Sequence, residues 1–259
     1  MKRLSTKQDK QSLITLYNLC FGGEEEFCKR FFDNVWCEHN TAVIEKDGKI
    51  VCMTQMMPLI LTDGNRKFSA YYIYALCTHP DYRGRSLAKQ LLEFCENENK
   101  DCDFVVLIAG NKSLCNYYEK LGFKRTFGFK KFSVDAKNFH IPYEETKDYK
   151  KVIDIYEKNF KGIVHNFRTE LDTQLNLTCS KAKIFCSDDS YCIAEIGNEN
   201  IRIAEAVGKN ADRLAAKLAF DFGFKSAEVV THGDELMLGM AKSLHRDVDF
   251  SGYINLLFN

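Results

Sequence analysis

The stretch YYIYALCTHPDYRGRSLAKQLL, residues 71–92, carries the pattern on which the fold prediction rests. Its first part is rich in tyrosine and predicts a strand that stops at His79-Pro80, because the residue before a proline disfavours helix. Its last part has apolar residues one turn apart and predicts an amphipathic helix. Between them, residues 83–85 read Arg-Gly-Arg. A helix that starts after such a turn presents unpaired backbone N–H groups, which bind phosphate well.

The composition around this turn favours an anionic ligand. Arg83, Arg85 and Lys89 add positive charge locally, although the chain as a whole has 36 Lys+Arg and 36 Asp+Glu. Gly84 allows a ligand to approach the backbone closely. We therefore predict pyrophosphate binding at residues 83–88. The alternative is an ordinary strand-to-helix turn with solvated arginines.

The turn resembles the acyl-CoA signature of the GNAT superfamily of N-acetyltransferases, Arg/Gln-x-x-Gly-x-Gly/Ala. In this chain the signature reads Arg83-Gly84-Arg85-Ser86-Leu87-Ala88. Its first and last positions match, and Ser86 stands where the family usually has glycine. A serine forced to positive φ would be strained by roughly 1–2 kcal/mol, whereas a serine in the first helical turn could bond a phosphate oxygen. We expect the second case.

A second signature follows at the distance that is typical of the family. The stretch NKSLCNYYEKLGF, residues 111–123, resembles the family element in which a tyrosine stands near the thioester sulfur. By this resemblance Asn111 belongs to the cofactor site, and Tyr118 is the general acid that protonates the departing CoA thiolate. A tyrosine with an ordinary pKa near ~10 stays protonated at neutral pH and can donate. The alternative is that Tyr118 is a core aromatic that braces its helix.

The resemblance implies further roles for the strand before the turn. Leu76, Cys77 and Thr78 would hydrogen-bond the pantetheine arm through their backbone, where this strand separates from the next. A backbone N–H near Leu76 would polarise the thioester carbonyl for direct attack by an amine. Cys77 then has no need to act as a nucleophile. The strands 50–61 and 68–78 bring only Asp63, in their connecting turn, so we name no side-chain base. His79 is the alternative, although its place beside Pro80 indicates a role in the turn.

The pattern of elements predicts an α/β (α+β) fold of two tandem GNAT-like domains, with mixed central sheets flanked by helices and a degenerate second copy. Residues 1–135 form the acyl-CoA-binding catalytic domain, with the order α-α-β-β-β-α-β-α-β. Residues 136–259 repeat it without the late short helix, after a linker at 135–147. In this half we expect a helix over 167–177 and a last strand over 253–258. Residues 207–210, Val-Gly-Lys-Asn, replace the phosphate turn, so we expect a structural or substrate-shaping role.

The tandem layout resembles the enhanced intracellular survival type of acetyltransferase, without its third, sterol-carrier-like domain. In those proteins the terminal carboxylate reaches the active site. We therefore hypothesise that the carboxylate of Asn259 lies near Tyr118, anchored by the apolar run at 253–258.

Composition argues against a nucleic-acid-binding, a membrane-spanning and a metal-binding protein. A neutral chain is a poor nucleic-acid binder, and no apolar run is long enough to cross a membrane. The 11 cysteines lack a C-x-x-C pair, which favours free thiols in a reducing cytoplasm and gives no metal site. The expected function is N-acetyl transfer from acetyl-CoA, the cosubstrate, to a primary amine of a small molecule or peptide. The alternative is a non-catalytic sensor or scaffold that binds acetyl-CoA or CoA. A homodimer is compatible with the sequence.

Overall fold

The computed structural model describes residues 1–22, 25–245 and 250–256, and these form two compact units. Unit 1 contains the described residues of 1–61 and 68–125 together with 239–245. Unit 2 contains 62–67, 126–238 and 250–256. The predicted division at residue 135 places 239–245 with the second domain, whereas the structure groups this segment with unit 1.

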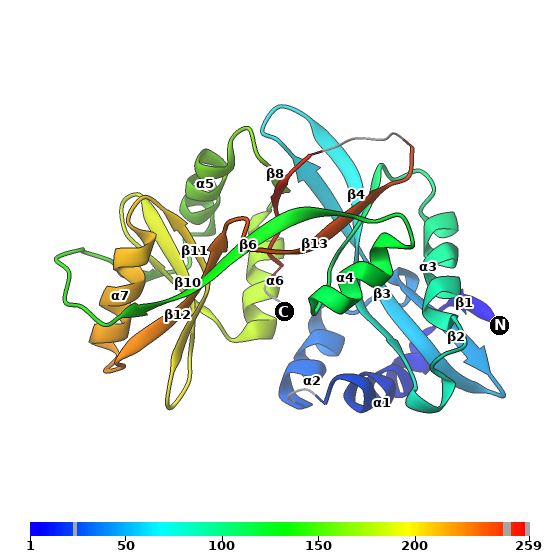
Figure 1. Cartoon of the computed structure of the whole chain (residues 1–259). Coiled ribbons are helices and arrows are strands. Elements are labelled where there is room, and N and C mark those ends of the chain that lie inside the picture. Colours follow the sequence, from blue (N-terminus) through cyan, green and yellow to red (C-terminus); the bar gives the residue numbers. More distant parts are fainter. Residues whose placement is uncertain (23–24, 246–249, 257–259) are drawn as a thin grey trace. The chain divides into compact units, whose positions relative to one another are not determined.

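Unit 1 is a mixed sheet with helices packed on it (Figure 1). Its strands are ordered β1-β2-β3-β4-β5-β13, with β4 and β5 parallel and β13 antiparallel to β5. Lys242 of β13 binds Glu96 of α3 at 2.7 Å, which fixes this late strand in the unit. The elements in chain order are β1 (Lys2–Leu4), α1 (Lys10–Phe21), α2 (Glu25–Asn34), β2 (Thr41–Lys46), β3 (Lys49–Thr62), β4 (Lys67–Thr78), α3 (Leu87–Glu98), β5 (Phe104–Ile108), α4 (Lys112–Glu119) and β13 (Leu236–Ser243).

The central strands explain why unit 1 has helices around its sheet. In β4 the five consecutive residues 70–74 are buried, and β5 is buried at 104–107. A strand that is buried on both faces requires cover on both. The amphipathic helix α3 supplies part of that cover through Leu87, Leu91 and Cys95. The mixed α/β fold class predicted from the sequence is therefore confirmed.

Unit 2 repeats the core of unit 1 (Figure 1). The order α5-α6-β9-β10-β11-α7-β12 matches α1-α2-β2-β3-β4-α3-β5, and the described part of the unit has no counterpart of α4. Its strands are ordered β6-β12-β11-β10-β9-β7. The elements are β6 (Lys124–Asp135), β7 (Glu144–Thr146), α5 (Tyr149–Phe160), β8 (Val164–Asn166), α6 (Glu170–Ser180), β9 (Lys183–Cys186), β10 (Ser190–Ile196), β11 (Ile201–Gly208), α7 (Ala211–Asp221), β12 (Ser226–His232) and β14 (Gly252–Tyr253).

Several predicted boundaries in unit 2 were wrong. The linker prediction missed β7, which pairs with β9, and no strand was predicted at β8, which pairs with β14. The predicted helix at 167–177 begins later, because the Thr169 side chain caps α6 by accepting from the N–H of Asp172. The predicted last strand is reduced to β14, and residues 257–259 lie outside the described part.

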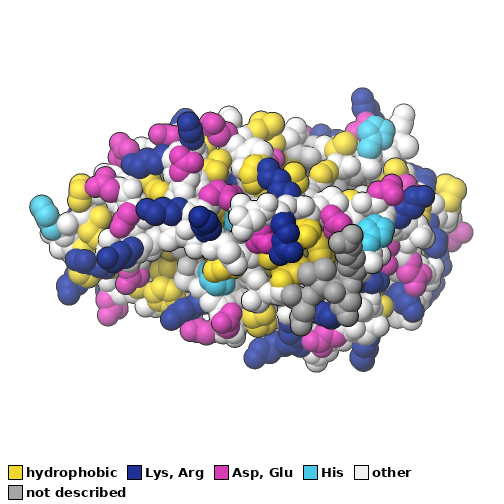
Figure 2. Space-filling view, turned by 90° about the horizontal axis from the view of Figure 1, so that it is seen from above, with side chains coloured by type: hydrophobic (Ala, Val, Ile, Leu, Met, Phe, Trp, Pro, Cys, Tyr) yellow, Lys and Arg dark blue, Asp and Glu magenta, His cyan; other side chains and the backbone are white. Residues whose placement is uncertain are grey.

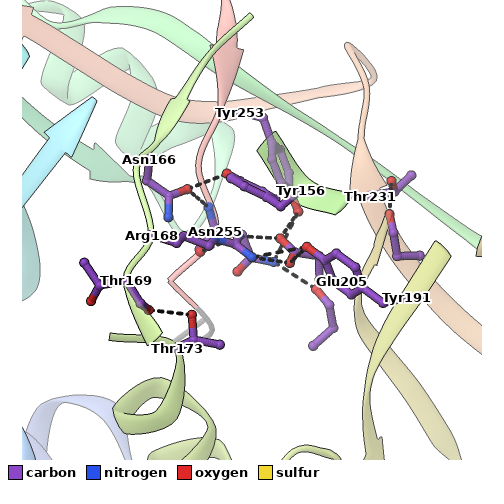
Figure 3. Close-up of polar contacts among 12 residues, drawn as sticks. Tyr156, Asn166, Arg168, Thr169, Thr173, Tyr191, Glu205, Thr231, Tyr253 and Asn255 are labelled. Carbon is purple, nitrogen blue, oxygen red and sulfur yellow. Dashed lines mark hydrogen bonds and ion pairs between the residues drawn. The ribbon is translucent and has the colours of Figure 1, made fainter. Parts of the chain in front are cut away.

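A buried ion pair stands in the core of unit 2 (Figure 3). Arg168 donates to both carboxylate oxygens of Glu205, at 2.6 and 2.7 Å. Tyr191 and Tyr253 donate to the same carboxylate, and the Tyr156 ring lies 3.7 Å from the guanidinium carbon of Arg168. Burial alone would lower the pKa of Arg168, but attraction to Glu205 outweighs it and the pKa is raised.

The same cluster fixes the described end of the chain to unit 2. Arg168 also donates to the carbonyl of Asn255 at 3.2 Å, and Asn255 donates through its side chain to the carbonyl of Ala204 at 3.0 Å. The apolar run at 253–258 was predicted to anchor the chain end, and its first residues do so. Asn259 itself lies outside the described residues, so its predicted place near Tyr118 stays a hypothesis.

We predict that Arg168→Ala lowers the free energy of unfolding by about 3–5 kcal/mol, because the carboxylate of Glu205 would be buried without its partner. Arg202→Ala is the matched control. It removes an ion pair with Glu195 in which both side chains are about a third exposed, worth at most ~1 kcal/mol. Urea unfolding followed by circular dichroism, with hydrogen exchange of the β10 and β11 amides, measures both. Equal losses in the two variants would contradict a structural role for the cluster.

Candidate functional site

The central parallel strand pair of unit 1 opens into a fork. The strands β4 and β5 are paired only from Ala70 with Phe104 to Tyr72 with Val106. Beyond Tyr72, β4 continues for six residues to Thr78, and within the described residues its register with β5 does not extend past Tyr72. Leu76 and Thr78 are partly exposed there, and Cys77 is buried. The predicted pantetheine-binding residues therefore lie on the free arm of the fork, where backbone groups are available to a ligand.

A residue that sequence reasoning missed lies on this arm. Ala75 has a φ of +53°, in the left-handed region that alanine rarely adopts. Strain of this kind costs of order 1–3 kcal/mol and is found mostly at functional sites. Inside an extended strand, one left-handed residue turns the peptide that follows it. The N–H of Leu76, which we predicted to polarise the thioester carbonyl, belongs to that peptide.

The turn after β4 is open to solvent and tied to the fork. Arg83 donates through Nε to the carbonyl of Thr78 at 3.2 Å, so the turn stays next to the free arm. Gly84 has a φ of +74°, and a Cβ added there would meet nothing within 4 Å. Arg85 lies with its guanidinium carbon 5.2 Å from the ring centre of Tyr82. Both arginines are exposed, so an anion can reach them.

The predicted conformation of Ser86 was wrong. It does not lie in the first turn of α3 but is its N-cap residue, in the left-handed region with a φ of +54°. Its side chain makes no capping hydrogen bond, so it satisfies none of the first N–H groups of the helix. Leu87 and Ala88 begin the helix, and the Leu87 side chain is buried, which leaves its backbone N–H as the group for a ligand. The glycine that the family usually has at this position would adopt the same positive φ without steric strain.

Tyr118 and Asn111 occupy different places on α4. Tyr118 is 8% exposed, and its hydroxyl forms no hydrogen bond within the described residues. Burial raises its pKa, and the neighbouring Tyr117 and Tyr72 raise it further. Asn111 is the N-cap of α4 and accepts from the N–H of Leu114 at 2.9 Å. Its side chain is thus engaged within the helix, and its predicted contact with the cofactor stays a prediction.

Comparison with known sequences decides the family of this part. Residues 2–126 match the sequence model of the acetyltransferase (GNAT) domain, just under half of the chain. The N-terminal half of the chain is a GNAT acetyltransferase domain. The family catalyses acyl transfer from acyl-CoA. Among proteins with curated descriptions, none matches the sequence.

Solved structures extend the similarity of fold across the chain. A GCN5-related N-acetyltransferase from Anabaena variabilis is 15% identical, with a TM-score of 0.72 over 95% of this chain and 73% of that one. A probable N-acyltransferase from Enterococcus faecalis is 14% identical, with a TM-score of 0.71 over 94% and 72%. Eis1 from Mycobacterium abscessus is 10% identical, with a TM-score of 0.65 over 95% and 74%. The resemblance to the tandem GNAT type is confirmed at the level of fold.

The described strands of the GNAT domain bring no carboxylate to the fork. Asp63 accepts from the backbone N–H of Arg66 and of Asn65 and from the Arg66 guanidinium, and these bonds hold its pKa at about 2. His79 caps a short 3-10 helix, where its Nδ1 accepts from the N–H of Asp81. Both residues shape turns, as the sequence predicted.

The equivalent fork in unit 2 is bridged. The strands β11 and β12 are also paired over three positions and separate after Ile203 and Val229. Here Thr231 donates across the gap to the carbonyl of Ala206 at 2.7 Å (Figure 3). Gly208 packs against Asp189 and Ser190 so closely that a Cβ would overlap them. A cavity of about 320 Å³ remains beside Asp212, which places a negative charge in the first turn of α7.

Charged side chains of both signs are mixed on the surface of the molecule. Figure 2 shows Lys and Arg side chains interspersed with Asp and Glu on the face drawn, without a field of one sign. The described residues contain no group of three or more His, Cys, Asp or Glu arranged to hold a metal ion. No described helix is long and apolar enough to cross a membrane.

We predict that Ser86→Gly raises the free energy of unfolding by about 0.5–1 kcal/mol, because relief of left-handed strain exceeds the entropy cost of glycine. The matched variant Gly84→Ala introduces the same strain in the same turn and should lower it by about 1 kcal/mol. Thermal unfolding compares the two, with shifts of opposite sign and roughly 2–4 °C. A fall in melting temperature for Ser86→Gly would contradict the left-handed conformation.

Proposed function

We propose that the GNAT domain transfers an acetyl group from acetyl-CoA to a primary amine by direct attack. The observation that carries the proposal is the fork after Tyr72. Its free arm is distorted at Ala75, ends at Thr78 and is followed by the turn that leads into α3. The fork exposes backbone groups for the pantetheine arm, and the turn at 83–86 exposes N–H groups and arginines for the pyrophosphate. Gly84, with open space in place of a Cβ, lets that anion approach.

The proposed reaction uses the backbone N–H of Leu76 and the hydroxyl of Tyr118. The amine nitrogen attacks the thioester carbon, and the carbonyl oxygen gains negative charge, which the N–H of Leu76 stabilises. The nitrogen releases a proton to water as the C–S bond breaks, and the electron pair of that bond leaves with sulfur. Tyr118 gives its proton to that sulfur and regains one from solvent. Because burial raises the pKa of Tyr118, its hydroxyl stays protonated through neutral pH and remains a donor.

A second candidate function has specific support. Ser86 is strained where a glycine would not be, and the described parts of β3 and β4 carry no carboxylate to accept the amine proton. Both features fit a protein that binds acetyl-CoA or CoA as a sensor or scaffold without turnover.

The acceptor class and the compartment are part of the same proposal. The proposed acceptor is a primary amine of a small molecule or of a peptide. All 11 cysteines are free thiols, which supports a reducing compartment, the cytoplasm. A homodimer is the oligomeric state we would test first.

We predict that Tyr118→Phe lowers kcat roughly 10²-fold, because a general acid contributes on this scale. Its affinity for acetyl-CoA should stay within about 2-fold, since the phenyl ring keeps the packing. The adjacent Tyr117→Phe is the control and should retain turnover. Free CoA thiol released with a panel of primary amines measures the rates. Equal rates for Tyr118→Phe and the original protein would remove Tyr118 from the mechanism, and binding without release for any amine would favour the sensor.

A further inference from the structure

The cavity beside the bridged fork of unit 2 has no part in the proposed function. Its volume is about 320 Å³, and all of its lining residues belong to unit 2. Five elements form its walls, namely β6, α5, β11, α7 and β12. Such a volume accommodates about ten non-hydrogen atoms, since a water molecule takes about 30 Å³. The cavity is therefore much smaller than a whole acyl-CoA and large enough for a small organic molecule.

Three rings line the cavity, and the packing of unit 2 holds them in place. They belong to Phe132, Phe160 and His232. Phe160 is buried and stacks on Tyr253, with ring centroids 4.9 Å apart and ring planes 7° apart. His232 meets Phe160 edge to face, with centroids 5.7 Å apart and an angle of 76° between the planes. Rings that are already fixed lose little freedom when a ligand packs against them.

The polar groups of the cavity favour a ligand with a positive charge. Among the described residues, its lining includes one carboxylate, that of Asp212, and no lysine or arginine. No cation of the described part of the chain is paired with this exposed carboxylate. Burial lowers the pKa of His232, so its imidazole is neutral at pH 7. The Asn159 side chain donates to the carbonyl of Ile155 at 2.8 Å, which leaves its side-chain oxygen as a further acceptor.

The charges around the cavity do not reverse this preference. The N-terminus of α7 adds about half a positive charge, which is less than the full negative charge of Asp212. A second cavity, of about 620 Å³, shares Asn159 as a wall, and its four aspartates and four lysines cancel in charge. Lys130 lies with its Nζ 5.3 Å from the ring centre of Phe132, and Glu235 pairs with it at 3.6 Å. The Phe132 ring thus already accepts a cation of the chain, whose charge Glu235 offsets.

We propose that this cavity of unit 2 binds a small organic cation, an ammonium group carried on an apolar body. The ammonium pairs with the carboxylate of Asp212, and the rings of Phe132 and Phe160 attract it through their negative faces. The apolar body packs against Ala206 and Val207 on β11. The same carboxylate repels phosphates and carboxylic acids. The second copy of the fold therefore carries a ligand site whose preferred charge is opposite to that of the phosphate turn in unit 1.

The test titrates the full chain with benzyltrimethylammonium at pH 7 and measures the heat of binding. This probe has the size of the cavity and no N–H, so it cannot be acetylated, and its binding is independent of the proposed function. We expect a Kd of roughly 0.1–1 mM, on the scale of a ligand with so few atoms. Phenylacetate, of similar size and opposite charge, should bind at least about 10-fold more weakly. Hydrogen exchange with the saturating cation should slow at 206–208 and 211–213.

Two variants assign the charge and the ring. Asp212→Asn should weaken binding of the cation about 5-fold, the scale of an exposed charge pair. Asp154→Asn is the matched control, because it removes an exposed carboxylate of the second cavity, and it should leave the Kd within about 2-fold. Phe132→Leu keeps an apolar side chain and should weaken binding about 2- to 5-fold. No heat with millimolar probe, equal affinity for phenylacetate, or equal losses in the two aspartate variants would overturn the proposal.

Discussion

The loss of pairing between β4 and β5 after Tyr72 is the constraint on which the rest of unit 1 depends. A central strand with unpaired backbone groups is costly unless water or a ligand satisfies them. Two local features accompany this loss of pairing. Ala75 adopts a left-handed conformation, and Arg83 donates a hydrogen bond to the carbonyl of Thr78. Within the described residues, the segment 75–77 of β4 thus has no register with β5.

Unit 2 has the same strand topology, but its fork is bridged by a side chain. Its fork also opens after three paired positions, but Thr231 bridges it and Gly208 is packed against the β9–β10 turn. The unit contains a buried ion pair between Arg168 and Glu205. Tyrosine hydroxyls donate to this carboxylate, and one of them, on Tyr253, belongs to the last described segment of the chain. These side chains satisfy each other, so they stabilise the unit and present no free polar group to a substrate. This contrast supports a structural role for the second copy.

The phosphate turn and most helices and strands of the fold could be predicted from the sequence, because each depends on residues close together in the chain. The turn at 83–88, the helices with periodic apolar residues and the strand at 104–108 each follow from their own residues. Two of the missed elements depend on partners distant in sequence: β8 is a strand through its pairing with β14, and β7 through its pairing with β9. Ala75 gave no signal, since alanine is not a residue that marks positive φ. Ser86 was misassigned for a related reason, because a serine near a helix start normally suggests a side-chain cap.

The central claim is that acyl-CoA binds at the fork of unit 1 and not at the fork of unit 2, which Thr231 bridges. Hydrogen exchange with and without saturating acetyl-CoA tests it most directly, because it reports each backbone amide separately. The account predicts slower exchange at 76–78 and 87–89, no change at 206–208, and no effect of adenosine at the same concentration. Protection at 206–208 with none at 76–78 would contradict it.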